Sequence, residues 1–222
     1  MVIKVGEIYP TNNYGSLEVV EYINARKILV RFINTGYEKY TSAGHMRDGV
    51  VKDPLYPTIF GKGYFGVGSY KSWTNGKITK VYKTWNNMLQ RCYDEKSLGN
   101  NPTYKGCTVV KEWHNFQVFG KWFDNNYIEG YQIDKDIKVP GNRVYGPDTC
   151  TFVTHMENSE TASAVSAIFR TPEGKRIEVY NISKFARENG LSGSGLSNVK
   201  NGKRNHHKGW TLWKEEEKQS GG

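Results

Sequence analysis

The stretch Asn189-Gly-Leu-Ser-Gly-Ser-Gly-Leu-Ser-Asn-Val-Lys-Asn-Gly-Lys-Arg-Asn-His-His-Lys-Gly-Trp210 sets the fold of the C-terminal part of the chain. Just before it, Asn181 can cap a helix over residues 182–189, and Gly190 can end that helix. A second short helix fits residues 194–200. Two short helices around a tight, glycine-containing turn are typical of a helix-turn-helix motif.

The second predicted helix begins at Ser192 or Ser194 and ends near Gly202. It carries hydroxyl and amide side chains of the kind that read base edges, and a basic run suited to phosphates follows it. A charged loop that only faces water is the alternative interpretation. Because the basic run follows directly on a capped helix, we predict that the DNA contacts are made by Ser192, Ser194, Ser197, Asn198, Lys200, Asn201, Lys203, Arg204, His206, His207 and Lys208.

The charge distribution points to the same part of the chain. The 222 residues include 31 Lys and Arg against 22 Asp and Glu, a formal net charge of +9. Residues 166–222 alone hold 11 basic and 6 acidic residues, so they carry +5 of that excess. An excess of this sign favours polyanionic partners, and nucleic acid comes first among them.

The composition excludes several classes of protein. Hydrophobic residues make up 37% and aromatic residues 14% of the chain, which is too much apolar surface for a disordered protein. No apolar stretch approaches the roughly 18 to 20 residues that cross a bilayer, and the first residues lack the apolar core of a signal peptide. We therefore expect a soluble, cytoplasmic protein without a membrane partner. Cys92, Cys107 and Cys150 form no CxxC pair, so reduced thiols are expected.

Changes in composition near residues 68 and 165 predict a chain of α+β class in three parts with a frayed tail over residues 214–222. In residues 1–68, short runs of β-branched and aromatic residues alternate with glycines, which predicts a small SH3-like β-barrel that serves as an accessory domain. Residues 69–165 form the second part. Residues 166–213 form the third, with a β-hairpin before the helix-turn-helix.

In the second part the apolar residues recur at helical spacing. Val81, Trp85, Met88, Leu89 and Cys92 predict one amphipathic helix. A stripe of Trp and Phe over residues 113–123 predicts a second, and such aromatics are more often core than base-stacking platforms. Strands are expected over residues 131–134 and 150–154, followed by a helix over residues 155–165.

The C-terminal part resembles the modular DNA-binding repeats at the C-termini of phage and intron-encoded homing endonucleases. The shared features are the helix Ile182-Ser-Lys-Phe-Ala-Arg-Glu-Asn-Gly190 and the ending Asn201-Gly-Lys-Arg-Asn-His-His-Lys-Gly-Trp210. The resemblance covers roughly 45 residues. It implies a DNA-binding module attached to a nuclease domain.

Residues 80–160 resemble a group of phage HNH-related proteins. The residues that carry the resemblance include Trp85-Asn-Asn-Met-Leu-Gln-Arg-Cys92, Tyr104-Lys-Gly-Cys107, Ile133-Asp-Lys-Asp136 and Tyr145-Gly-Pro-Asp-Thr-Cys-Thr-Phe-Val153. In HNH nucleases two strands and a helix clamp one divalent metal ion. The resemblance therefore implies a ββα-metal domain with flanking helices.

Carried over by position, the resemblance makes Asp134 a metal ligand and places Asn158 on the metal-binding helix. Lys135 stands where the family has its catalytic His. Asp136 follows on the same face as Asp134 if the strand extends that far, because alternate strand residues share a face. Two carboxylates suit Mg²⁺ or Mn²⁺, and a solvated turn is the alternative interpretation.

The missing His changes the expected chemistry. A lysine with the usual pKa of about 10.4 is protonated at neutral pH and is a poor base. We therefore expect Lys135 or Arg143 to neutralise charge on the phosphate, and Asp136 or His155 to remove the proton.

Two further metal sites are weighed and set aside. Structural zinc on the three cysteines and His114 is not expected, because the spacings lack the short-knuckle pattern of zinc sites. His206 and His207, adjacent on a basic loop, are expected to contact phosphate instead of metal.

These patterns predict a sequence-specific, metal-dependent endonuclease of the HNH homing type that acts on double-stranded DNA, with no obligatory protein partner and a phage or prophage source. One alternative is a nuclease-derived DNA-binding protein that has lost catalysis with the His. A second alternative is an RNA-binding protein, which would prefer single-stranded RNA to duplex DNA.

Overall fold

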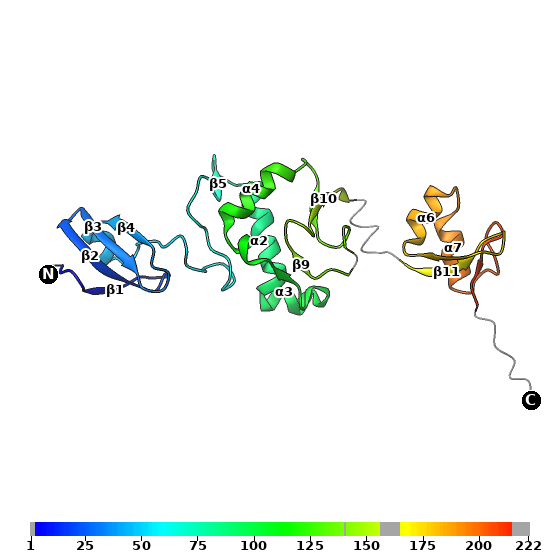
Figure 1. The fold of residues 1–222 in the computed structure, drawn as a ribbon, viewed down its shortest axis with the longest axis horizontal. Coiled ribbons are helices and arrows are strands. Elements are labelled where there is room, and N and C mark those ends of the chain that lie inside the picture. Colours follow the sequence, from blue (N-terminus) through cyan, green and yellow to red (C-terminus); the bar gives the residue numbers. More distant parts are fainter. Residues whose placement is uncertain (1–2, 140, 156–164, 215–222) are drawn as a thin grey trace, which may run out of the picture. The chain divides into compact units, whose positions relative to one another are not determined.

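A computed structural model describes residues 3–139, 141–155 and 165–214. Helices and strands both occur in it (Figure 1). The contacts within the chain divide it into two compact units. The first unit contains residues 1–129 and 138–151, and the second contains residues 130–137 and 152–222.

The first unit begins with a four-stranded antiparallel meander. Its strands are β1 (Ile8–Pro10), β2 (Ser16–Asn24), β3 (Lys27–Phe32) and β4 (Glu38–Thr41), in that spatial order. Alternate residues of β2 and β3 are buried, so one face of the sheet forms the core. The short helix α1 (Ala43–Arg47) adds Ala43 and Met46 to this core, which also contains residues 3, 9, 17, 19, 28, 30, 32 and 51.

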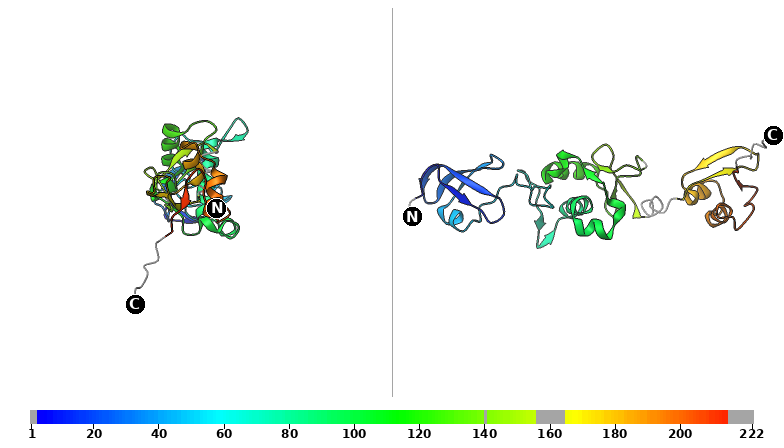
Figure 2. Two further views of the ribbon diagram at one scale, coloured as in Figure 1. Left: turned by 90° about the vertical axis from the view of Figure 1, so that its right-hand side faces the viewer. Right: turned by 90° about the horizontal axis from the view of Figure 1, so that it is seen from below.

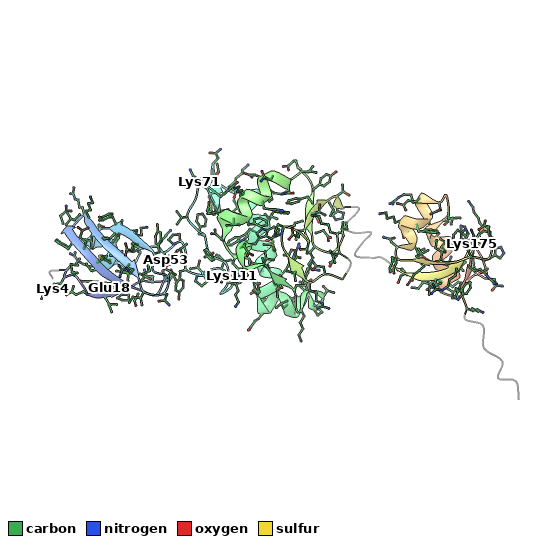
Figure 3. The ribbon with its side chains drawn as sticks, viewed as in Figure 1. Lys4, Glu18, Asp53, Lys71, Lys111 and Lys175 are labelled. Atoms are coloured by element: carbon green, nitrogen blue, oxygen red, sulfur yellow. The ribbon has the colours of Figure 1, made fainter. Side chains whose placement is uncertain are left out.

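The predicted barrel is corrected to an open sheet. β1 and β4 are its two edges, and no strand pairing joins them in the described residues. The chain leaves β4 into α1 instead of a closing strand, and Asp53 then fixes the segment that follows. The buried Asp53 carboxylate accepts hydrogen bonds from the Thr35 hydroxyl (2.5 Å) and the Leu55 N–H (2.8 Å; Asp53 is labelled in Figure 3).

Helices dominate the rest of the first unit. The elements are β5 (Trp73–Thr74), β6 (Lys77–Ile78), α2 (Lys80–Tyr93), α3 (Glu95–Asn100), a 3-10 turn at Pro102–Tyr104, β7 (Thr108–Val109), a 3-10 turn at Lys111–His114, α4 (Phe116–Asn126) and β9 (Val144–Tyr145). β5 and β6 form a hairpin, and β7 pairs with β9 in parallel. α2 confirms the helix that the apolar spacing predicts.

Aromatic side chains fill the space between α2 and α4. The Trp85 indole N–H donates a hydrogen bond to the Trp113 carbonyl (2.7 Å), and the Phe116 ring centroid lies 5.3 Å from that of Trp85. Trp85, Trp113, Phe116 and Phe119 are all buried. The aromatic stripe is therefore core, as predicted.

The second unit holds two sheets. β8 (Gln132–Asp134) pairs with β10 (Thr151–Val153). A three-stranded antiparallel sheet has the order β12 (Arg176–Val179), β11 (Ala167–Arg170), β13 (Thr211–Leu212). The β11–β12 hairpin confirms the turn predicted at residues 171–174.

Two helices pack on one face of the three-stranded sheet, as the right-hand view in Figure 2 shows. They are α6 (Ile182–Glu188) and α7 (Gly193–Lys200), and together with the sheet they form the C-terminal module, residues 165–214. Its buried residues are Phe169, Val179, Ile182, Ala186, Leu196 and Val199. Asn181 caps α6 as predicted, since its side chain accepts a hydrogen bond from the Lys184 N–H (2.9 Å).

No helix in residues 3–139, 141–155 and 165–214 is both long and apolar enough to span a bilayer.

Candidate nucleic-acid interface and metal-binding residues

A small network of hydrogen bonds fixes the start of α7. The Ser192 hydroxyl accepts from the Gly195 N–H (3.2 Å) and so caps the helix. The Nε2 atom of His207 accepts from the Ser192 N–H (3.1 Å). A Cβ added to Gly195 would lie 2.6 Å from His207 Nδ1, so only glycine lets this imidazole approach the helix. His207 therefore positions α7.

One face of α7 points away from the sheet. Ser194, Ser197, Asn198 and Asn201 follow the spacing i, i+3, i+4, i+7, which places them on one side of the helix. Ser194 and Asn201 are exposed, whereas Ser197 and Asn198 are half-buried. In the described residues, no group hydrogen-bonds to the side-chain amides of Asn198 and Asn201. This α7 face, residues 194, 197, 198 and 201, thus offers two amides without a partner in the described residues, whereas the Ser194 hydroxyl lies in hydrogen-bond contact with that of Ser192 (2.9 Å).

The basic loop that follows α7 is held by its backbone. The N–H groups of Lys203 and Arg204 both donate to the Asn198 carbonyl, at 2.8 and 3.2 Å. Their side chains are exposed, as is that of His206, while Lys200 is half-buried. The Lys208 ammonium donates to the Gly190 carbonyl (3.0 Å). Of the predicted DNA contacts, Ser192, Ser194, His207 and Lys208 thus make side-chain hydrogen bonds inside the module.

Asp134 is the last residue of β8, and its carboxylate closes a tight turn. Its Oδ1 atom accepts from the N–H groups of Asp136 (2.8 Å) and Ile137 (2.7 Å). Because the strand ends at Asp134, the alternation of strand faces does not apply to Asp136. The strand does not extend to Asp136, so the condition for a shared strand face of these two carboxylates is not met.

Lys135 and Asp136 form an ion pair. Lys135 is only 8% exposed, and its ammonium lies 2.7 Å from both carboxylate oxygens of Asp136. Asp136 is thus already engaged by a cation. No group in the described part of the chain hydrogen-bonds to the Oδ2 atom of Asp134.

Among these residues, one carboxylate oxygen is placed to bind a hard cation. Mg²⁺ and Mn²⁺ prefer carboxylate oxygens, and Asp134 Oδ2 is such an atom with its carboxylate already oriented. Asn158 lies outside the described residues. Within the described ranges, no three His, Cys, Asp or Glu side chains gather into a metal site.

The two remaining predicted catalytic residues lie in different units. Arg143 donates from Nη1 to the Lys105 carbonyl (2.5 Å), and its own carbonyl accepts from the Thr108 N–H (2.8 Å). Arg143 therefore fixes the loop before β7, although its side chain stays exposed. His155 is exposed.

The cysteines and His114 serve the core of the first unit in the described structure. Cys92, Cys107 and Cys150 are buried, and none of them forms a disulfide within the described residues. The Tyr93 hydroxyl lies 3.1 Å from His114 Nε2 and accepts from the Val109 N–H (2.9 Å). Burial is the main cause that lowers the pKa of His114, and the nearby Lys62 adds to it.

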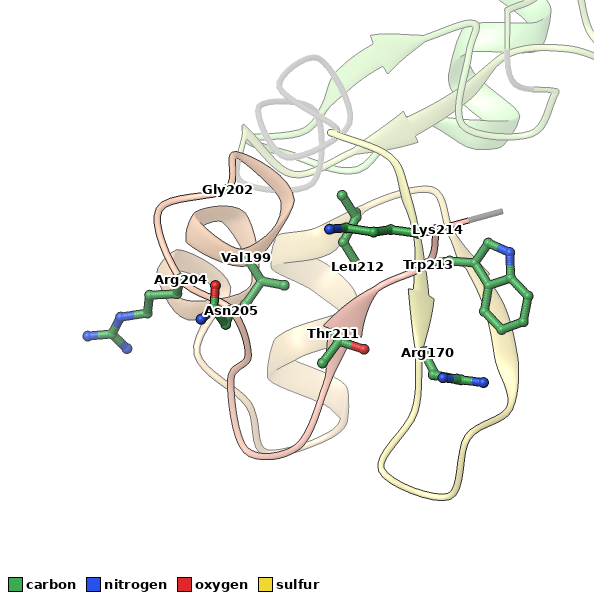
Figure 4. A pocket seen from close by; sticks show the side chains of 9 residues that line it. All are labelled: Arg170, Val199, Gly202, Arg204, Asn205, Thr211, Leu212, Trp213 and Lys214. Atoms are coloured by element: carbon green, nitrogen blue, oxygen red, sulfur yellow. The ribbon is translucent and has the colours of Figure 1, made fainter. Parts of the chain in front are cut away.

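The structure also contains a hollow that the sequence did not predict. It lies beside the C-terminal end of α7 and the edge strand β13, with a volume of about 600 Å³ (Figure 4). Its polar and aromatic lining comes from Arg170, Arg204, Asn205, Thr211, Trp213 and Lys214. We call it the β13 pocket. Its residues come together only through strand pairing, which explains why no local sequence pattern revealed it.

Comparisons with known proteins place few constraints on this chain. No family model and no curated protein matches it. One solved structure, described as DNA binding and cleavage by the HNH homing endonuclease I-HmuI, is similar at 23% identity with a TM-score of 0.22. The similarity covers 41% of this chain and 62% of that one, so it spans less than two thirds of the neighbour's length.

Proposed function

We propose that this protein is a sequence-specific DNA endonuclease of the HNH homing type, whose C-terminal module binds the target. The observation that carries the proposal is the α7 face. Four polar side chains share one side of an exposed helix, and two of their amides have no partner in the described residues. Asn amides can pair with adenine through two hydrogen bonds.

The dimensions of α7 suit a groove of duplex DNA. An α-helix with its side chains is about 10–12 Å across, and the major groove is about 12 Å wide, so α7 can lie in it with its eight residues along the groove. Lys203 and Arg204 follow at its C-terminal end, where their exposed cations can reach phosphates on the groove wall. Base readout and phosphate contact would then come from adjacent segments.

Asp134 is the residue we propose to hold the metal ion. The ion, Mg²⁺ or Mn²⁺, would polarise the scissile phosphate and favour attack by water. Asp134 would orient it through Oδ2, because two backbone N–H groups hold Oδ1. Asn158 is proposed as a further ligand. Within the same unit as Asp134, the exposed His155 would take the proton.

A second candidate function is a DNA-binding protein that derives from a nuclease and does not cut. The ion pair between Lys135 and Asp136 favours it. Lys135 stands where the HNH pattern has its catalytic base, and it also occupies both oxygens of the neighbouring carboxylate. DNA recognition by the α7 face would be the same in both cases.

Binding is tested by selecting duplexes from a random pool with the full chain and measuring their affinity. Replacing Asn198 and Asn201 by Ala should cost about 1–3 kcal/mol of discrimination for each lost pair of base contacts. Non-specific affinity should stay unchanged. The control variant Asn142→Ala alters an asparagine of the first unit, and it should leave the selected preference intact. An unchanged preference in the α7 variant would exclude this face as the reader.

Cleavage is tested on supercoiled plasmid with Mg²⁺, with Mn²⁺ and without metal. Asp134→Asn keeps an oxygen that can accept the turn's N–H groups but removes the charge that attracts a cation, so nicking should be lost. Asp148→Asn, at an exposed carboxylate nearby in sequence, is the matched control. Nicking by Asp134→Asn at the wild-type rate would exclude the proposed site. No nicking by the wild type with either metal would support the second candidate.

A further inference from the structure

The outer face of the three-stranded sheet carries two arginines side by side. Arg170 of β11 lies directly opposite Arg176 of β12 in the antiparallel register. The neighbouring pair, Phe169 and Ile177, points toward the helices and the core. Because side chains alternate along a strand, both arginines point away from that core, and both are exposed.

The two guanidinium groups repel each other when no ligand is bound. Like charges directly opposite each other on a sheet are destabilising. In the described part of the chain, neither arginine forms an ion pair, although the exposed Glu178 lies two residues from Arg176 on the same strand. An anion bound between the two arginines would remove the repulsion.

Trp213 orients one of these arginines. The guanidinium carbon of Arg170 lies 5.6 Å from the centre of the Trp213 indole ring, a cation–π geometry. The backbone N–H of Trp213 donates to the Ile168 carbonyl (2.9 Å), which extends the pairing of β11 with β13 by one residue. Figure 4 shows both side chains on the same side of the sheet. A guanidinium held in this way still presents its N–H edge to an oxyanion.

The β13 pocket continues this cationic surface. Arg170, Arg204 and Lys214 line it, and no carboxylate of the described residues does; Glu215, Glu216 and Glu217 follow Lys214 in the sequence, outside those residues. Asn205 and Thr211 add hydrogen-bonding groups. Thr211 of β13 lies directly opposite Arg170 of β11, and both residues line the pocket. The pocket is therefore continuous with the outer face of the sheet. Positive charge and neutral hydrogen-bond donors suit phosphate groups.

We propose that the β13 pocket and the adjoining arginines form a second nucleic-acid site, which grips the phosphates of a strand without reading its bases. This site goes beyond the proposed function, because the α7 face reads sequence and the β13 pocket does not. The pocket begins at Gly202 and Arg204, directly after α7. A strand could therefore follow the basic loop from α7 into the pocket and onto the sheet.

The test uses the full chain with Arg170 and Arg176 both changed to Gln. Affinities for a single-stranded oligonucleotide and for a non-specific duplex are measured over a range of salt concentrations. Each lost phosphate contact should reduce the slope of log affinity against log salt by about 0.7 for the single strand and about 0.9 for the duplex. The slope should thus fall by about 1.4 or 1.8, and affinity at low salt should fall with it.

A matched control separates this site from net charge. Lys71→Gln with Lys77→Gln also removes two exposed charges, from the β5–β6 region of the first unit (Lys71 is labelled in Figure 3). It should leave both slopes near the wild-type values. Equal slopes in all three proteins, or equal losses in both variants, would overturn the proposal. Tighter binding of a poly-glutamate peptide than of either nucleic acid would also overturn it.

Folding and base recognition are measured on the same proteins. Both double variants should unfold near the wild-type temperature: the lysine variant changes exposed side chains only, and in the arginine variant the relief of the repulsion offsets the lost cation–π contact with Trp213. The arginine variant should also keep the sequence preference that Asn198→Ala with Asn201→Ala abolishes. The asparagine variant could keep its sequence preference while the arginine variant shows a smaller slope of log affinity against log salt. That result would contradict base reading by the α7 face but would support the second nucleic-acid site at the β13 pocket.

Discussion

His207 could either hold α7 in place or contact DNA, and its replacement by Ala distinguishes these two roles. The sequence predicts a phosphate contact, but the structure shows His207 Nε2 accepting the Ser192 N–H at 3.1 Å. A hydrogen bond of this kind contributes about 0.5–1.5 kcal/mol net. Its loss should therefore open the first turn of α7 more often, by about fivefold for a cost near 1 kcal/mol. The backbone pairing of residue 207 with Trp210 does not depend on the imidazole.

The assay is amide hydrogen exchange at Ser192 and Gly195 in the free protein. Both amides should exchange about fivefold faster in His207→Ala, whereas exchange in α6 should not change. His206→Ala is the matched control, because His206 is exposed and makes no hydrogen bond within the described residues. The structural role would be refuted if Ser192 and Gly195 exchanged at the same rate in both variants, and if the dependence of DNA affinity on salt were weaker in His207→Ala alone.

Three further changes test the packing and the titration of the fold. Gly195→Ala should destabilise the C-terminal module, because its methyl group would displace the His207 ring. Thermal unfolding should show this loss, whereas Gly99→Ala, in open space and without a positive φ, should show none. Phe169→Ala should cost about 3–5 kcal/mol, because the ring is fully buried; denaturant unfolding measures it, and a cost below 1 kcal/mol would contradict the assigned core. Because the pKa of His114 is lowered in the folded state, the unfolded state binds more protons below about pH 6.5, so stability should decline as the pH falls through that value. Urea titrations at several pH values should show this decline reduced in His114→Phe, and an identical decline would exclude His114 as its source.

Local patterns made much of the fold predictable. The apolar spacing of α2, the cap at Asn181 and the turn at residues 171–174 all depend on residues close together in the chain. Ser192 was one of two predicted caps for α7, and its hydroxyl does accept the Gly195 N–H. Such features follow from side-chain volume, hydrogen-bonding capacity and backbone freedom within a few residues.

The remaining features depend on contacts between distant residues. β13 has only two residues, too few for a periodic signal, and it pairs with β11 some forty residues earlier. His207 reaches Ser192 across fifteen residues, so its place in the basic run suggested phosphate instead. The end of β8 at Asp134 likewise arises from a turn that the alternation of residues did not reveal.

The candidate metal site was only partly accessible to sequence reasoning. The resemblance singled out Asp134, and the structure gives that residue an oriented carboxylate. The pairing of Lys135 with Asp136 was not foreseen, because the burial of the lysine depends on its surroundings and not on its neighbours in sequence.

The most direct test of the account is photo-cross-linking from α7 to a selected DNA duplex. A photoreactive amino acid replaces Ser197 on the α7 face in one protein and Glu18, an outward-facing residue of β2, in another (Glu18 is labelled in Figure 3). The account predicts that position 197 cross-links to bases within the selected site, and that unlabelled selected duplex competes this product away. Position 18 should give no such product. Absence of base cross-links from position 197, with binding intact, would contradict recognition by the α7 face.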